Sequence, residues 1–166
     1  MVRIDTDGKF CIFTKTRVNL IADVQGRFSS SGPMEFATSS NNRVDTRVGP
    51  KPQAGSTTRI PTGLPGGTPY ALVNLTMTQS DGGGYITAER DCATATAARF
   101  AKSNGNFVSG RDLANLSVVP LASDGSFCIY TEIPTHLVVD VQGSFSPSNS
   151  LRFALSGPSR QLDTRR

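Results

Sequence analysis

The sequence predicts an all-β protein, an antiparallel β-sandwich-like module with a repeated hairpin unit. Three observations carry this prediction. Gly and Pro contribute 16 and 10 of the 166 residues, whereas only 37% of the residues are apolar and Trp is absent. Short segments alternate apolar and polar residues between turn sequences, and a long stretch of sequence occurs twice. Such a pattern is typical of turn-rich β proteins and excludes a helical bundle.

Residues 70–78 form the clearest predicted strand, because apolar residues occupy every second position. These positions are Ala71, Val73, Leu75 and Met77. A period of two is typical of a half-buried strand. The Gly-rich segment 80–84 predicts a turn, so residues 85–88 begin the returning strand of a hairpin.

A second group of strands is predicted in the C-terminal half. Residues 116–121 form a short apolar strand, and a turn at 123–126 leads into a strand at 127–130. We expect residues 137–141 to be the hairpin partner of 127–130. The N-terminal residues 10–13 and 20–24 show the same pattern and predict the same hairpin.

Two segments are ambiguous. Residues 88–101 are rich in Ala but lack an apolar stripe, so strand or loop is favoured over helix. Residues 49–67 contain four Pro and five Gly, which predicts an exposed connection with at most short strands.

A long internal repeat organises the chain. Residues 7–28 read DGKFCIFTKTRVNLIADVQGRF, and residues 124–145 read DGSFCIYTEIPTHLVVDVQGSF, 117 positions later. The match continues at residues 36–37, and after a one-residue slip VDTR at 44–47 aligns with LDTR at 162–165. A period of this length is the size of a β-sandwich module, far longer than a solenoid repeat.

The phase of the repeat divides the chain into three parts. Residues 1–42 are expected to be the end of one repeat, 43–145 a main β module, and 146–166 the start of the next repeat. Alternatively, the copies at 7–47 and 124–165 flank a unique middle within one compact domain. The sequence leaves both arrangements open.

Charge and hydropathy exclude several function classes. The net charge is +4, but the Arg residues are spread along the chain without the basic stripe that nucleic-acid binding requires. No apolar run approaches the length of a membrane span, and no segment resembles a signal peptide. We therefore expect neither a nucleic-acid partner nor a membrane span.

The motifs resemble a known family. In order, they read VDTR, ALVNLTMT, GGYITAERDC, DLANLSVVPLASDGSFCIYT, HLVVDVQGSF and LDTR. This order is similar to that of tandem modules in secreted and cell-surface proteins of actinobacteria, with hallmarks RLLDTR, VVLNVTVT, GYLTVYPCG, NLVLAPV and VVVDVVGYF. The resemblance covers nearly all of 43–166 and implies an extracellular, wall-associated and non-catalytic role. The chain departs from it at residues 42–44 and at Gln142 and Ser144.

The resemblance also implies a disulfide. Its two cysteines correspond to Cys92 and Cys128, and extracellular proteins commonly oxidise such pairs. Cys11 is the repeat counterpart of Cys128, so its own partner would lie upstream. The alternative is three reduced thiols. No CxxC motif or cluster of His accompanies them, so we expect no zinc.

Acidic and basic residues recur with the repeat. The recurring residues are Asp23, Asp45, Asp140, Asp163, Arg47 and Arg165. Asp45 and Asp140 could offer oxygens to a calcium ion, but no D-x-D-x-D-G spacing supports this. We expect instead that Asp45 caps its turn and that Arg47 pairs with a strand carboxylate such as Asp140.

No catalytic constellation is recognisable. His136 is the only histidine and no G-x-S-x-G motif accompanies it, so we expect an exposed residue at a strand end, no cofactor and no enzymatic activity. The expected role is structural or adhesive, with neighbouring repeats or copies of the same chain as head-to-tail partners on a bacterial surface. The alternative is binding of cell-wall polysaccharide, which would require an exposed row among Tyr70, Tyr85 and Tyr130.

Overall fold

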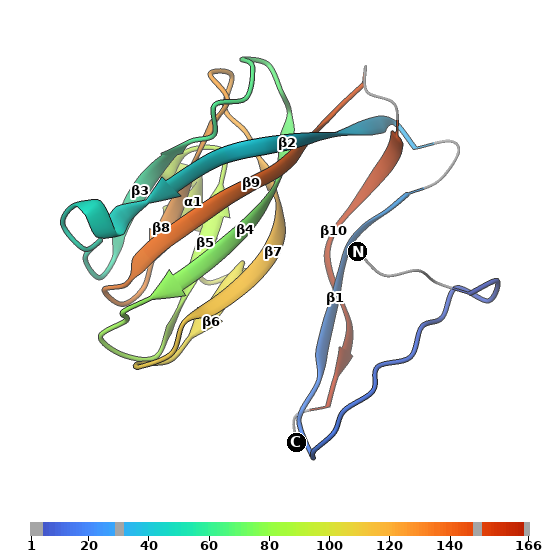
Figure 1. Ribbon diagram of the computed structural model, residues 1–166, viewed down its shortest axis with the longest axis horizontal. Helices are drawn as coiled ribbons and strands as arrows, with labels where there is room; N and C mark the ends of the chain where they lie inside the picture. Colours follow the sequence, from blue (N-terminus) through green and yellow to red (C-terminus); the bar gives the residue numbers. More distant parts are fainter. Residues whose placement is uncertain (1–4, 29–31, 148–150, 165–166) are drawn as a thin grey trace.

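The computed structural model describes residues 5–28, 32–147 and 151–164, and it confirms the all-β prediction (Figure 1). Two antiparallel sheets form a sandwich. The larger has six strands in the order β1 (Ile21–Phe28), β10 (Leu151–Asp163), β2 (Met34–Asp45), β9 (His136–Ser146), β4 (Tyr70–Thr78) and β7 (Leu113–Pro120). The smaller has four in the order β3 (Ser56–Pro61), β8 (Ser126–Thr131), β5 (Gly84–Glu89) and β6 (Gly105–Phe107).

The core lies between the two sheets. The predicted alternation of β4 is confirmed, because Ala71, Val73, Leu75 and Met77 are all buried. Side chains of the other sheet, including Phe127 and Ile129 of β8, belong to the same buried cluster. Each fully buried aliphatic or aromatic side chain of this kind stabilises the fold by about 1.5–3 kcal/mol relative to exposure.

Two predicted hairpins are wrong. Residues 70–78 and 85–88 form β4 and β5, which belong to different sheets, and the predicted pair 127–130 and 137–141 is divided in the same way. β8 pairs with β3 and β5, whereas β9 pairs with β2 and β4, so the connection crosses from one sheet to the other. The reason is burial, since every residue of β8 is buried and the strand therefore needs cover on both faces. Ser80 and Thr135, whose hydroxyl oxygens lie 2.5 Å apart, are buried beside this crossover.

The favoured strand or loop at 88–101 is also corrected. Residues 88–89 end β5, but Cys92–Ala98 form a short helix, α1. Asp91 caps this helix by accepting a hydrogen bond of 2.8 Å from the backbone N–H of Thr94, and this bond lowers the pKa of the Asp91 carboxyl. Ala95 is buried beside Cys128 and Tyr130, so packing against β8 holds the helix in place.

A disulfide joins α1 to β8. Cys92 and Cys128 are bonded, with their Cα atoms 4.9 Å apart, as the resemblance implied. Cys11 is exposed and free. The bridge covers the outer face of β8, the face turned away from the main core.

β1 and β10 form a two-stranded arm that stands apart from the sandwich (Figure 1). The strand predicted at 10–13 does not form, and its side chains are exposed, with Phe13 at 89%. The counterpart of this segment is β8, which is held between β3 and β5. Those two strands have no second copy in the sequence, so the N-terminal segment lacks the neighbours that would order it.

Removing the bridge in a Cys92→Ala/Cys128→Ala variant is expected to lower the free energy of unfolding by about 3–4 kcal/mol, the chain-entropy value for a closed loop of this size. Urea unfolding of the oxidised protein measures the difference. The matched control, Cys11→Ser, should leave the midpoint unchanged. Equal stability of the double variant and the wild type would contradict the structural role of the bridge.

Candidate functional site

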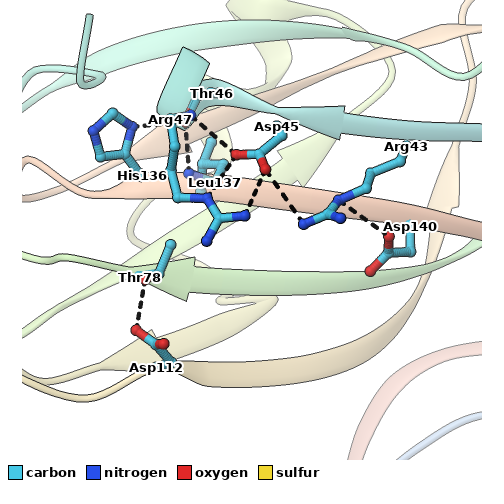
Figure 2. Close-up of polar contacts among 9 residues, drawn as sticks. All are labelled: Arg43, Asp45, Thr46, Arg47, Thr78, Asp112, His136, Leu137 and Asp140. Carbon is cyan, nitrogen blue, oxygen red and sulfur yellow. Dashed lines mark hydrogen bonds and ion pairs between the residues drawn. The ribbon is translucent and has the colours of Figure 1, made fainter. Parts of the chain in front are cut away.

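The recurring DTR sequence forms a turn at the end of β2 (Figure 2). Asp45 caps the 3-10 helix Thr46–Val48 by accepting a hydrogen bond of 3.0 Å from the backbone N–H of Arg47. The Arg47 guanidinium donates two more bonds to the same carboxylate, from Nε at 2.9 Å and from Nη2 at 2.6 Å. These bonds hold the pKa of Asp45 well below its usual range and raise that of Arg47.

The expected pair between Arg47 and Asp140 is therefore replaced by a local one. Arg43 occupies the place beside Asp140, with Nε 3.8 Å from the Asp140 carboxylate and Nη2 3.3 Å from that of Asp45. The Arg43 and Asp140 side chains are 54% and 39% exposed. Solvent-exposed pairs of this kind contribute little to stability.

Thr46 connects the DTR turn to β9. Its hydroxyl oxygen accepts a hydrogen bond of 2.8 Å from the backbone N–H of Leu137 and lies 3.1 Å from Nδ1 of His136. One hydroxyl thus contacts both the backbone and a side chain at the beginning of β9. His136 is buried rather than exposed as expected. Sequence reasoning singled out the charged residues of the motif and missed Thr46, although its recurrence in both copies was a usable signal.

The same contact occurs in the arm. Thr164 is the repeat counterpart of Thr46, and Leu20 is that of Leu137. The Thr164 hydroxyl accepts a hydrogen bond of 2.6 Å from the backbone N–H of Leu20, and the Thr164 N–H donates one of 2.9 Å to the Leu20 carbonyl oxygen. Thr46 and Thr164 thus bind their partner strands in the same way.

The strand registers agree as well. In the sandwich, Asp45 lies opposite Val138, Val44 opposite Val139, and Phe36 opposite Phe145. The repeat counterparts in the arm pair as Asp163 with Ile21, Leu162 with Ala22, and Phe153 with Phe28. Both pairings shift register next to the central residue of the VQG motif. The arm β1·β10 is therefore a second copy of the pair β9·β2.

The glycine of the VQG motif has a steric role in this pairing. A Cβ atom at Gly143 would lie 2.4 Å from the ring of Phe36 and 2.5 Å from the carbonyl oxygen of Ala37. The Phe36 ring in turn lies 5.0 Å from that of Phe145, centroid to centroid. Gly143 thus allows β2 to approach β9 closely, and Gly26 stands at the same place in β1.

The two copies meet around a local pseudo-twofold axis. In the pairing of β10 with β2, Arg152 lies opposite its own repeat counterpart, Glu35. On one side, Leu151, the repeat counterpart of Met34, lies opposite Phe36. On the other side, Phe153, the counterpart of Phe36, lies opposite Met34. The strand order β1-β10-β2-β9 is symmetric about this point, so the sheet joins two copies of one strand pair.

The DG-containing turn is also repeated. Asp5 N–H donates to the Lys9 carbonyl oxygen as Ala122 N–H donates to that of Ser126. Gly8 and Gly125 both adopt positive φ, at 75° and 78°, which glycine does without strain. The turn therefore forms from local sequence even where the following strand does not.

Two further predicted residues lie in the arm. Asp163 and Asp23 keep strand positions opposite Ile21 and Arg160. Arg165 lies outside the described residues.

Other kinds of site find little support in the described part of the chain. No group of three or more His, Cys, Asp or Glu residues there could hold a metal ion, and none of its helices has the length and apolar character to cross a bilayer. Tyr130 is buried, and Tyr85 packs against it with ring centroids 6.3 Å apart. The tyrosines thus do not form an exposed row.

Comparisons with known proteins add no identification. No protein-family model, curated protein or solved structure matches the chain. The internal symmetry of the molecule is therefore the main functional observation.

Thr46→Val keeps the shape of the side chain but removes the hydroxyl that accepts from Leu137. Because the Leu137 N–H would lose its partner, we expect the free energy of unfolding to fall by about 1–3 kcal/mol. Thr46→Ser, which keeps the hydroxyl, is the control and should retain most of the stability in urea unfolding. A Val variant as stable as the Ser variant would show that the bond contributes nothing.

The depressed pKa of Asp45 predicts a loss of stability in acid. The stabilisation is present above the carboxyl pKa of the unfolded chain, about 4, and is lost as the pH falls further. Thermal midpoints between about pH 5 and pH 2 should therefore decline less steeply in Asp45→Asn than in the wild type. Arg47→Gln removes the partner and should flatten the same part of the curve. An unchanged slope in both variants would contradict the assignment.

Proposed function

We propose that this chain is a non-catalytic structural module of an extracellular tandem array on a bacterial surface, in which each sandwich is closed by pairing its first strand with its last. The observation that carries the proposal is the arm. β1 has the sequence of a last strand and β10 that of a first strand, and they pair in the register of β9 and β2.

The organisation of the strands supports a repeating unit. β2 opens the sandwich and β9 ends it, and only residues 147–150 separate β9 from the next first strand, β10. A short connection of this kind is typical of consecutive elements in a compact protein. In an array, the same period would place one sandwich directly after another.

The covalent and polar chemistry fits the proposed setting. The Cys92–Cys128 bridge is compatible with an oxidising, extracellular environment. His136 is buried and engaged with Thr46, an arrangement that favours a structural role for the only histidine. The DTR sequence recurs in both copies, and in this proposal the turn that it forms after β2 holds the first strand against the last.

A duplicated chain tests whether the repeat is a structural unit. A variant with residues 34–150 present twice in succession should form two sandwiches, each with its own internal disulfide. We expect a thermal midpoint within a few degrees of the parent and a larger maximum dimension in small-angle X-ray scattering, because the second unit adds to the first without replacing its contacts.

The matched control duplicates only residues 46–150, which omits the first strand, β2, from the second unit and keeps β3. This control should unfold at lower temperature or aggregate, since the last strand of its second sandwich keeps β4 as a neighbour but has lost β2. Disulfides formed between the two units of the full duplication, or a collapse of its thermal midpoint, would contradict the proposal.

A further inference from the structure

The arm is weakly attached to the sandwich. Among the described residues, its pairing with the rest of the sheet is confined to Leu151, Arg152 and Phe153 of β10, opposite β2. Val139 and Val141 of β9 belong to the core between the sheets and Val44 of β2 packs against it, whereas none of the arm side chains that the structure describes belongs to it. Val141 of β9 is 4% exposed, whereas its counterpart Val24 in β1 is 38% exposed, and Leu162 of β10 is 42% exposed.

The stability of this arm depends on local pairing alone. Isolated two-stranded ribbons are at best marginally stable in water. Here the two strands are held together by their register, by the Thr164–Leu20 hydrogen bonds, and by being tethered to one sandwich. The tether raises the effective concentration of each strand around the other. It adds no contact that the same strand of another copy could not make.

The two strands also come from opposite ends of the chain. β1 precedes the whole sandwich and β10 follows it (Figure 1). Every residue that β1 recognises in β10 is therefore offered equally by the β10 of a second copy. Exchange of an identical element between copies is the arrangement known as domain swapping.

We propose that the arm is an exchangeable joint: β1 of one copy pairs with β10 of a second copy, in the register seen within the chain. This inference rests on the proposed function, because it treats β10 as the first strand of one repeat and β1 as the last strand of another. Reciprocal exchange gives a closed pair of chains, and non-reciprocal exchange gives a head-to-tail chain of copies. The pairing of β1 with β10 of its own chain competes with exchange, so exchange increases with protein concentration.

Ala22 and Leu162 provide the probe, because they lie directly opposite each other in the arm. All variants carry Cys11→Ser, so that the only free thiols are those introduced. Ala22→Cys alone and Leu162→Cys alone are purified, mixed, held at high concentration, and oxidised with glutathione disulfide. A cross-strand pair is close enough for a disulfide, so a bridge between the two variants reports β1 of one copy on β10 of the other.

The expected result is a disulfide-linked mixed dimer on a non-reducing gel, confirmed by peptide mapping. Its yield should rise with protein concentration and exceed several-fold that of a control mixture of Val48→Cys and Leu162→Cys. Val48 is 93% exposed and lies in the DTR turn of the sandwich, away from β1. A mixed-dimer yield no higher than that of the control overturns the proposal.

The double variant Ala22→Cys/Leu162→Cys separates this failure from failure of the proposed function. A bridge within the double variant together with no mixed dimer would mean that the arm exists but does not exchange, which refutes the joint and leaves the structural module intact. No bridge in either experiment would refute the joint and also remove the strand pairing on which the proposed function rests.

Discussion

The antiparallel pairing of β2 with β9 is the constraint on which the rest of the molecule depends. These strands open and end the sandwich, so their pairing fixes the larger sheet across almost the whole module. Three local features make the pairing specific: the close approach at Gly143, the tilted ring contact of Phe36 with Phe145, and the Thr46 bond to the beginning of β9. The same features recur in sequence at the chain ends, and the strands there pair in the same way.

The second sheet depends on β8, which is buried on both faces. One face belongs to the main core, and the other is covered by α1 and the Cys92–Cys128 bridge. The N-terminal copy of this strand shows what happens without that cover. Its turn at residues 5–9 keeps the same hydrogen bonds, but residues 10–13 remain extended and exposed. Turn geometry is thus local, whereas the strand requires neighbours.

The sequence predicted the features that depend on local pattern. The alternation of β4 and the turn-rich β class follow directly from residue order, and the resemblance supplied the disulfide. Features set by long-range packing were missed. The consecutive strands 127–130 and 137–141 suggested a hairpin, because the alternation of residues does not show which sheet a strand joins. Arg47 pairs with Asp45 and not with Asp140, because the turn brings Arg47 and Asp45 together. The helix at Cys92–Ala98 depends on its Asp91 cap and on packing against β8. Neither of these produces the apolar stripe in the sequence by which a helix is recognised.

The central claim is that the chain ends reproduce the closing strand pair of the sandwich. Cross-strand nuclear Overhauser effects in the isotopically labelled full chain test it most directly, because they report which backbone protons lie opposite each other. The account predicts contacts between Ala22 and Leu162 and between Gly26 and Leu155, matching those between Val139 and Val44 and between Gly143 and Thr38. Contacts in the sandwich with none in the arm, or an arm in a different register, would contradict it.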